Sequence, residues 1–409
     1  MTRILFHGGD VFDGTGAAPA PADVVVQDGR FVEVGSDLDG DVAVEVSGRT
    51  LLPGLMDCHV HVIVDHVDSV RHLAAPFSYK FYVAQSNLGR ILDCGITTVR
   101  DAAGADLGIK QAVADGVIRG PRMFIALSLL SQTGGHGDGW MPSGACVRLL
   151  DGWPGMPHNL VDGPEEMRRK VRELVRAGAD QIKLCSSGGV MSPRDNPHHA
   201  HFGMDELEVA VREAEAAGLY VMAHAQATQG IKNAVQAGIR SIEHGIFLDD
   251  ETVAMMLERG TFLVPTLMAP LSVLQAADEG AAIQEASLEK ARMVVASHAE
   301  SFRLAAEAGV KVAMGTDAVG IPHGRNLEEL ELMVKHGLDA TEALKAATSN
   351  AAELLRIDDE LGTIAPGKRA DLVVIDGDPL DFVGLRDRVA GVWKDGQHVA
   401  GVVGAGAAA

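Results

Sequence analysis

The chain has 409 residues, of which 47% are hydrophobic, and its formal net charge at pH 7 is −21. This length suits a large barrel with a minor domain, and the apolar content excludes a disordered chain. A surface this acidic repels phosphate backbones and anionic lipids, which argues against nucleic acid or a membrane as partner.

The N-terminal segment and the cysteines indicate a cytoplasmic protein. No apolar run approaches the roughly 18 residues of a membrane span. The first residues, MTRILFHGGDVFDGTG, lack the basic-then-apolar pattern of a secretion signal. The cysteines, Cys58, Cys94, Cys146 and Cys185, form no CxxC pair. We therefore expect reduced thiols in a cytoplasmic setting.

The two chain ends share a pattern of short strands and tight turns. The first part contains RILFHGGDVFDG, DVVVQDGRFVEVG and VAVEVSGRTLLPG, and the last part contains GTIAPGKRADLVVIDGDPL and VAGVWKDGQHVAGVV. Turn pairs such as DG are typical of hairpins. The pattern predicts one composite β-sandwich built from residues 1–52 and 361–409, with a second domain, residues 53–360, inserted between its halves.

The inserted segment alternates strands with helices. The apolar runs that predict strands are LLPGLMD, GITTVRD, RMFIALS, ADQIKL, LYVMAHA, IRSIEHG, TFLVPTL and VKVAMGTD. Helical patterns between them often end at a glycine, such as Gly178, Gly238 or Gly309, because glycine adopts the left-handed conformation at a helix end without steric cost. Eight strands in this alternation predict a (β/α)8 TIM barrel.

Two long loops interrupt the alternation. Residues 131–163 are rich in glycine, proline and tryptophan, and residues 186–203 contain His198, His199 and His201. Loops of this length in a compact domain are usually functional or disordered. Because they follow the third and fourth predicted strands, we expect them over the barrel mouth. The three histidines are interpreted as solvated surface.

Polar residues follow several of the predicted barrel strands. They are His59, His61, Lys183, His224, His244 and Asp317. The carboxyl ends of barrel strands meet on one face, so we expect these side chains to converge there. The two-residue period of a strand places His59 and His61 on the same side. Imidazole and carboxylate groups are common ligands of divalent metal ions, so the pattern predicts a metal site.

Lys183 and the neighbouring cysteines each leave two interpretations open. A protonated Lys183 amine would be repelled by metal ions, whereas carbamylation by carbon dioxide would make it an anionic bridging ligand. The alternative is a lysine that pairs with an acid and keeps its charge. Cys58 and Cys185 lie next to proposed ligands, but free cysteine is commonly a small buried apolar residue, and we favour that role for both.

The motifs PGLMDCHVHV, IKLCSSGG, AHA, IEHG, GTDA and GTIAPGKRADLVVIDGDPL together resemble the amidohydrolase superfamily, in the family's order and over nearly the whole chain. The resemblance implies two divalent ions, with zinc as the default metal. It assigns His59, His61 and Asp317 to the first ion, His224 and His244 to the second, and a carbamylated Lys183 to both. Paired ions lower the pKa of a bound water, and Asp317 is expected to carry its proton to the leaving nitrogen.

The finer phrases LSLLSQTGGHGD, GADQIKLCSSGGV and GIRSIEHGIFLDDET resemble the imidazolonepropionase-like branch, close to Xaa-Pro dipeptidases and acyl-amino-acid carboxypeptidases. The implied substrates are N-acyl amino acids or dipeptides with a free C-terminal carboxylate. His136 is then expected near the scissile carbonyl, or else it only stabilises a glycine-rich turn. Arg148 is the candidate for the carboxylate, because guanidinium binds carboxylate through two hydrogen bonds; an exposed loop arginine is the alternative.

Position 226 departs from the pattern of these relatives. Many of them have a tyrosine two residues after the strand-five histidine, and this chain has Gln226. Glutamine can still donate a hydrogen bond to the substrate, but the change puts Xaa-Pro specificity in doubt.

Three other functions compete with this interpretation. They are hydrolysis of a cyclic or other non-peptide amide, deamination of a heterocycle, and a scaffold without catalysis. Deaminase-type relatives generally lack the bridging lysine, so Lys183 argues against that subtype. An inactive scaffold would have lost metal ligands, and all the expected ones are present. Relatives of this branch are often homo-oligomers that act on small molecules, and we expect the same here.

Overall fold

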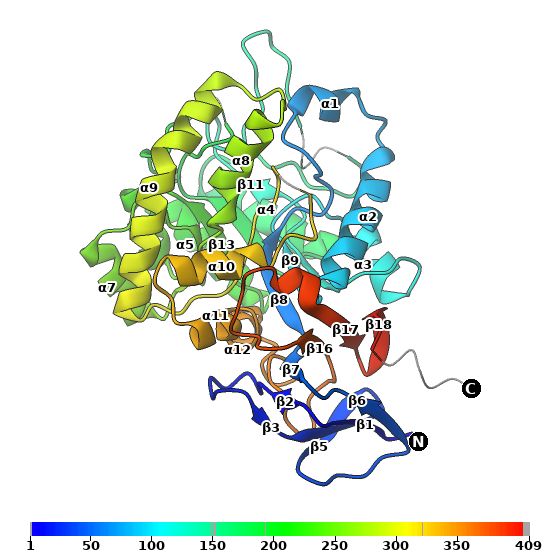
Figure 1. Cartoon of the computed structure of the whole chain (residues 1–409). Coiled ribbons are helices and arrows are strands. Elements are labelled where there is room, and N and C mark those ends of the chain that lie inside the picture. The colour runs from blue at the N-terminus through cyan, green and yellow to red at the C-terminus, as the bar shows by residue number, and fades with distance from the viewer. Residues whose placement is uncertain (1, 149, 151–152, 193, 321, 404–409) are drawn as a thin grey trace.

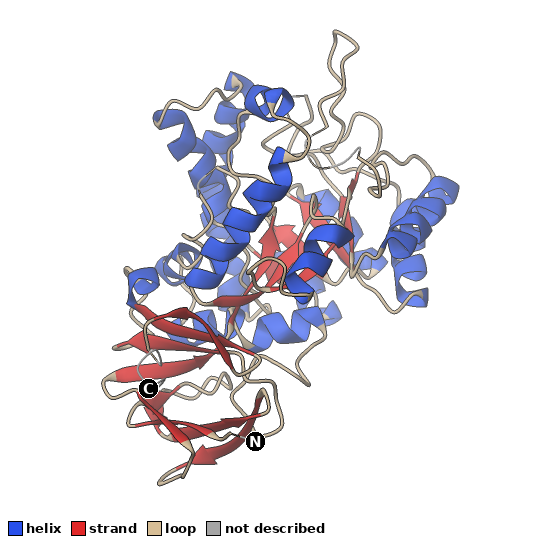
Figure 2. Cartoon of the chain, turned by 90° about the vertical axis from the view of Figure 1, so that its right-hand side faces the viewer, coloured by secondary structure: helices blue, strands red, loops and turns tan. Residues whose placement is uncertain are grey.

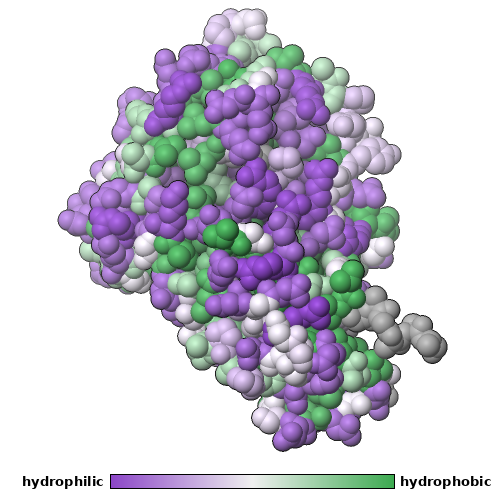
Figure 3. Space-filling view, viewed as in Figure 1, coloured by the Kyte–Doolittle hydropathy of each residue, from purple (hydrophilic) through white to green (hydrophobic). Residues whose placement is uncertain are grey.

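The computed structural model describes residues 2–148, 150, 153–192, 194–320 and 322–403. A β domain lies at the bottom of Figure 1, with the first and last described strands of the chain in it, and a larger region of strands and helices lies above it. Hydrophilic side chains predominate on the face seen in Figure 3, with apolar side chains scattered among them.

None of the helices in the described part of the chain has both the length and the apolar character that crossing a membrane requires.

The β domain consists of two sheets. The first has the order β5-β4-β1-β6 and contains only strands from the beginning of the chain: β1 (Ile4–His7), β4 (Asp23–Gln27), β5 (Arg30–Gly35) and β6 (Val42–Glu45). The second has the order β18-β17-β16-β7-β2-β3 and combines both ends: β2 (Asp10–Val11), β3 (Ala20–Pro21), β7 (Arg49–Pro53), β16 (Leu372–Asp376), β17 (Val389–Lys394) and β18 (Gln397–Gly401). A buried apolar cluster includes side chains of both sheets, and within it the rings of Phe6 and Trp393 meet edge to face at 5.0 Å.

Parallel strands form the barrel. One sheet has the order β10-β9-β8 and the other β11-β12-β13-β14-β15. Their bounds are β8 (Leu55–Val60), β9 (Ile96–Asp101), β10 (Arg122–Ile125), β11 (Leu129–Leu130), β12 (Ile182–Cys185), β13 (Val221–Ala225), β14 (Ser241–His244) and β15 (Phe262–Val264). The predicted fold class, a (β/α)8 barrel with a β domain, is confirmed. The domain limits 1–52, 361–409 and 53–360 remain a prediction.

The first predicted barrel strand, LLPGLMD, divides at Gly54. Residues before it belong to β7, which pairs with β16 in the β domain, and residues after it belong to β8 in the barrel. A Cβ at Gly54 would lie 2.2 Å from the Thr97 hydroxyl oxygen, so only glycine lets the chain pass this close to β9. The residues on both sides of Gly54 are apolar because both strands are buried, although in different domains.

The eighth predicted strand, VKVAMGTD, is only a short bridge in the structure. Val312 pairs with Leu263 of β15, and the Met314 carbonyl accepts a hydrogen bond of 2.8 Å from the Cys58 amide of β8. This segment therefore lies between β15 and β8 and closes the barrel. It is irregular because the Met314 amide donates to the Ala346 carbonyl instead of to a neighbouring strand.

Helices surround the barrel strands (Figure 2). Their bounds are α1 (Ser69–Ala74), α2 (Tyr79–Asp93), α3 (Leu107–Ala114), α4 (Pro164–Ala177), α5 (Met204–Ala216), α6 (Thr228–Ala237), α7 (Asp250–Arg259), α8 (Met268–Asp278), α9 (Glu285–Ala308), α10 (Glu328–Lys335), α11 (Ala340–Ala346) and α12 (Ser349–Leu355), with a 3-10 helix, η1 (Leu385–Arg388), near the end. The C-caps of α4, α6 and α9 are Gly178, Gly238 and Gly309, all in the left-handed conformation as predicted. The strands point away from the β domain, so their carboxyl ends face the loops at the top of Figure 1.

Candidate metal centre

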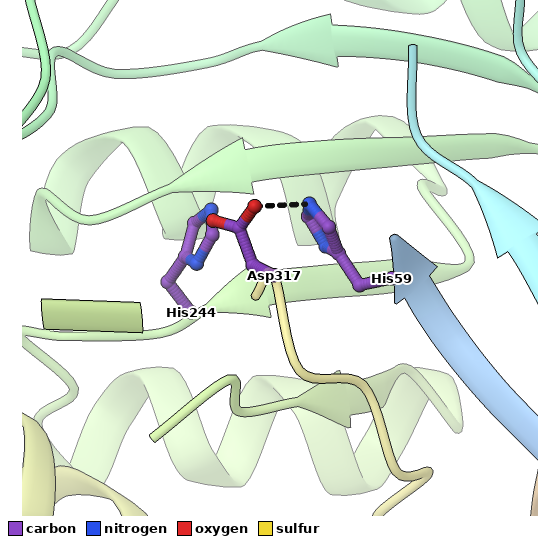
Figure 4. A group of neighbouring side chains, drawn as sticks. All are labelled: His59, His244 and Asp317. Carbon is purple, nitrogen blue, oxygen red and sulfur yellow. Dashed lines mark ion pairs between the residues drawn. The ribbon is translucent and has the colours of Figure 1, made fainter. Parts of the chain in front are cut away.

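The structure brings the predicted ligands together at the carboxyl ends of the barrel strands. The Asp317 Oδ1 atom lies 3.9 Å from the Nε2 atom of His59 and 3.5 Å from that of His61. The ring centre of His244 lies 5.2 Å from that of His59 and 4.6 Å from that of His224. The potential ligand atoms of His59, His244 and Asp317 all lie within 4.8 Å of one another (Figure 4). The two ligand sets that the resemblance keeps apart thus meet in one compact cluster.

Two of these residues have strained backbones. The φ angle is +73° at His244 and +47° at Asp317, in the left-handed region that residues other than glycine seldom adopt. Such a conformation costs on the order of 1–3 kcal/mol and is typical of functional sites. His244 is the last residue of β14, and Asp317 lies at the end of the segment that closes the barrel. At both residues the left-handed backbone turns the chain and directs the side chain to the cluster.

Each imidazole has one ring nitrogen occupied by a partner outside the cluster. The Nδ1 atoms of His59, His61 and His244 lie 2.7 Å from a Glu243 oxygen, the Ala103 carbonyl and the Thr266 hydroxyl, respectively. The Nε2 atom of His224 lies 3.1 Å from the Gly188 carbonyl. The second nitrogen of every ring is then left for a metal ion. Metal-binding histidines are commonly fixed in this way, so the donor set fits a divalent ion.

Burial keeps these imidazoles neutral. It lowers the pKa of His59, His224 and His244 well below the usual value, and the pKa of His61 to about 4. The charge of Lys183 acts in the same direction on each of them. Since only the neutral ring binds a metal ion, the imidazoles are in their ligand form at neutral pH.

Lys183 lies inside the barrel on β12 and is 2% exposed. Burial lowers the pKa of its amine. Among the described residues, none forms an ion pair or hydrogen bond with this amine, so the paired, charged lysine considered above finds no support. Cys58 and Cys185 are also buried, and burial raises the pKa of each thiol to about 12. Both are protonated at neutral pH, which fits the predicted apolar role.

The Asp317 carboxyl group holds its proton more tightly than an ordinary aspartate. Burial raises its pKa to about 7, although the charge of Lys183 acts in the opposite direction. In the protein without metal, this group therefore titrates near neutral pH.

A pH-dependent difference in stability follows for chelator-treated protein. The folded-state pKa of Asp317 is raised above its unfolded value, so its stabilising contribution is present at low pH and is lost as the pH rises towards 7. The asparagine side chain of the Asp317→Asn variant is neutral at every pH, so its burial is not opposed by ionisation. We expect the variant to match the wild type near pH 4 and to become progressively more stable than it up to pH 7. Thermal melts over this range test the expectation, and a constant difference would contradict it.

A buried ion pair supports His59 from behind. The Arg100 guanidinium lies 2.9 and 3.0 Å from the two Glu243 oxygens, and it also donates to the Cys58 carbonyl and the Ser241 hydroxyl. Glu243 and Arg100 are completely buried. Sequence reasoning missed both residues. The available signal was a charged side chain inside each of two apolar strands, VRD and IEH.

Glu243→Gln should weaken both folding and metal binding. The change leaves the Arg100 charge buried without a counterion, which costs about 3–5 kcal/mol of unfolding free energy. It also removes the carboxylate that orients His59, and losses of this kind typically weaken metal affinity about 10–100-fold. Urea unfolding and zinc titration measure the two effects. The control is Glu300→Gln, which breaks the exposed pair with Arg303 and should change neither. Equal behaviour of the two variants would contradict the supporting role of Glu243.

A second buried network joins β8 to the segment that carries Asp317. The Asp57 carboxylate accepts hydrogen bonds from the His59 amide, from the amide and hydroxyl of Thr316, and from the Asn326 side chain, at 2.7 to 3.1 Å. Burial still raises the pKa of Asp57 to about 6. The network fixes the strand ends that carry His59 and Asp317 relative to each other.

His136 reaches the cluster from the long loop after β11. Its ring stacks on that of His224, with centres 4.2 Å apart and planes at 14°. Its Nδ1 atom lies 2.9 Å from Asp195, which also accepts from the Lys290 amine at 3.0 Å and the Gly189 amide at 2.8 Å. Burial opposes ionisation of Asp195, but the hydrogen bond from His136 and the charge of Lys290 lower its pKa overall. His136 is therefore held beside the predicted ligands.

The other two predicted substrate residues lie in different settings. Gln226 is buried at the end of β13, and its Oε1 atom has no hydrogen-bond partner among the described residues. Arg148 is exposed and lines a separate cavity of about 350 Å³ with Arg71 and Lys80. The interpretation of the loop histidines as solvated surface is wrong for His201, which is 6% exposed because its part of the loop folds back onto the end of β12.

Comparison with known proteins identifies the family. Residues 50–406 match the Amidohydrolase family. The chain belongs to this family. An ochratoxinase from Aspergillus niger is 34% identical to this amidohydrolase, over 96% of this chain and 86% of the relative. An imidazolonepropionase from Rhizorhabdus wittichii is 26% identical over 91% of this chain and 93% of its own.

Solved structures agree with this assignment. A Xaa-Pro dipeptidase with bound methionine in the active site has a TM-score of 0.87 and 34% identity, covering 97% of this chain and 99% of its own. A prolidase complexed with N-methylphosphonate-L-proline has a TM-score of 0.89 and 37% identity, with the same coverage. The predicted superfamily and branch are confirmed, and the chain is a hydrolase that acts on small molecules.

Proposed function

We propose that this amidohydrolase cleaves a peptide-like amide bond in N-acyl amino acids or dipeptides with a free C-terminal carboxylate. The observation that carries the proposal is the cluster of four neutral imidazoles around Asp317, with His136 held beside it. The relatives support the substrate class, because one is a Xaa-Pro dipeptidase with bound methionine in the active site and another is a prolidase complexed with N-methylphosphonate-L-proline. We further propose a cytoplasmic homo-oligomer.

Two divalent ions, with zinc as the default, would be held by the residues that the resemblance assigns: His59, His61, Asp317, His224, His244 and Lys183. When bound, such a pair supplies Lewis acidity and a water with a lowered pKa. Lys183 fits the bridging role because burial lowers the pKa of its amine, and only a neutral amine attacks carbon dioxide. In that step an N–C bond forms, one amine proton is released, and the amine becomes a carbamate.

Asp317 and His136 would both act on the substrate amide, Asp317 by proton transfer and His136 by hydrogen bonding. The Asp317 carboxylate would accept a proton from the attacking water and return it to the departing nitrogen. With one ring N–H donated to Asp195, His136 would donate a hydrogen bond from its other ring nitrogen to the amide carbonyl when the imidazole is doubly protonated. The Asp195–Lys290 pair fixes the orientation of His136 for this contact.

A second candidate is hydrolysis of a cyclic or other non-peptide amide. Gln226 favours it, because its buried Oε1 atom has no partner among the described residues and can accept a hydrogen bond from the N–H group of a cyclic amide. The imidazolonepropionase relative, whose name refers to a ring compound, also supports this candidate. Deamination and a scaffold without catalysis both fit less well, because Lys183 and all the other predicted ligands are present.

A panel assay distinguishes these functions. Enzyme supplemented with zinc and bicarbonate is offered N-acyl amino acids, dipeptides, their C-terminal amides, lactams, hydantoins and aminated heterocycles, and amine release is measured. We expect release from compounds with a free carboxylate and at least about tenfold less from the matched C-terminal amides, since a charge-assisted hydrogen bond contributes about 1.5–3 kcal/mol. Turnover confined to ring compounds or uncharged amides would overturn the proposed substrate class.

A further inference from the structure

A second group of potential metal ligands lies outside the candidate centre. It consists of Asp65 and His66, in the loop after β8, and His72 in α1. One potential ligand atom from each residue lies within 4.8 Å of those of the other two. The His66 and His72 ring centres are 4.1 Å apart, with their planes at 31°. We propose that Asp65, His66 and His72 bind one divalent transition-metal ion, such as zinc, at a site separate from the catalytic centre.

The spacing of two of these atoms suits a tetrahedral ion. The His66 Nε2 atom lies 3.3 Å from the Asp65 Oδ1 atom. Zinc bonds of about 2.0–2.2 Å at a tetrahedral angle place neighbouring ligand atoms roughly 3.3–3.6 Å apart. The distance between these two atoms therefore matches that between two ligand atoms of one ion. His72 completes a His₂Asp set, the donor types that zinc prefers.

Hydrogen bonds leave the imidazoles available to the ion. The His72 Nε2 atom donates to the His66 carbonyl at 2.8 Å, so the lone pair of this ring is on Nδ1. The His66 Nδ1 atom is buried and has no hydrogen-bond partner among the described residues. No hydrogen bond to Nδ1 therefore fixes the orientation of the His66 ring. Burial and the neighbouring His72 also lower the pKa of His66, which favours the neutral form that binds metal.

The surroundings make this a weaker and more exchangeable site than the buried centre. The side chains of His66 and Asp65 are 15% and 24% exposed, and the group lines the cavity that also contains Arg148 and Lys80. The Arg71 guanidinium lies 3.9 Å from the second Asp65 oxygen, but Arg71 is 60% exposed and can turn into solvent when a cation binds. With three protein ligands, the fourth position is open to water or to an anion.

Binding here would have a local structural consequence. Asp65 and His66 belong to the loop that follows His61, whereas His72 belongs to α1, so one ion would tie the loop to the helix. The Asp68 side chain already caps α1 through the amides of Val70 and Arg71, which keeps the helix formed without the ion. We therefore expect zinc to slow hydrogen exchange over residues 65–74, in addition to any slowing that zinc causes at the catalytic centre.

Zinc stoichiometry tests the proposal directly. Chelator-treated wild type, His72→Gln, Asp65→Asn and the control His398→Gln are equilibrated with zinc, and bound zinc is measured by mass spectrometry. His398 is an exposed histidine of β18 in the β domain. We expect wild type and His398→Gln to hold one more zinc per chain than His72→Gln and Asp65→Asn. The difference between variants does not depend on how many ions the catalytic centre holds.

Cobalt provides a second readout that is independent of activity. A tetrahedral cobalt site has intense visible absorption, and one cobalt equivalent of this absorption should be missing from His72→Gln. Zinc-dependent slowing of hydrogen exchange over residues 65–74 should be lost with it. Equal zinc contents in wild type, His72→Gln and Asp65→Asn, with equal melting temperatures, would overturn the proposal.

Discussion

Asp317→Asn should abolish turnover and leave the fold intact. The proposed role of Asp317 is to accept a proton and return it to the leaving nitrogen, and an amide side chain cannot do either. Loss of general acid–base help of this kind is worth roughly 10²–10⁴ in rate. The fold should tolerate the change because asparagine adopts positive φ more readily than most residues, and φ at Asp317 is +47°. The 2.8 Å hydrogen bond from the Asp317 amide to the His59 carbonyl is also kept.

The measurement is kcat on the best substrate of the panel, together with zinc content and melting temperature. Asp37→Asn is a matched control, because Asp37 also has a positive φ, +55°, but lies exposed in the β domain. This control should keep full activity. If Asp317→Asn retained most of the wild-type rate at equal zinc content, Asp317 would not be the proton carrier.

The histidines at the strand ends of the metal centre could be predicted from the sequence, because the pattern that marks each of them involves only neighbouring residues. His59, His224 and His244 each follow a short apolar run, and parallel barrel strands necessarily place such residues on one face. Glu243 and Arg100 could not be predicted in the same way. Their contact joins β9 to β14 across 143 residues, and nothing in either strand indicates its partner.

The places where the structure differs from the sequence-based predictions also result from tertiary contacts. The run LLPGLMD is uniformly apolar, so its sequence contains no sign that it changes domain at Gly54. The segment that ends in Asp317 has the composition of a strand, yet its Met314 amide bonds to the Ala346 carbonyl and interrupts the pairing. The burial of His201 and the partnership of His136 with Asp195 depend on how two long loops pack together, which a periodic pattern does not encode.

Lys183→Met should remove activity and bound metal together. Methionine keeps the length and fills the same buried space, so the barrel should still fold, but it cannot form the bridging carbamate. Loss of a bridging ligand should cost more than the roughly 10–100-fold that loss of an outer-shell partner costs in metal affinity or activity. The matched control is Lys170→Met. Lys170 is another buried lysine, 8% exposed, but it lies on α4 and pairs with Glu173 away from the centre.

The carbamate itself has a signature that a structural lysine does not share. Enzyme prepared with ¹³C-labelled bicarbonate should show one carbamate carbon resonance in wild type and Lys170→Met, and none in Lys183→Met. In Lys183→Ala, which leaves a small cavity beside the imidazoles, a short carboxylic acid such as propionate should restore part of the activity by taking the place of the carbamate. Full activity and zinc content in Lys183→Met would show that this buried amine, with no charged partner among the described residues, contributes only to packing. The single-cluster geometry would then favour one ion held by His59, His244 and Asp317 over two bridged ions.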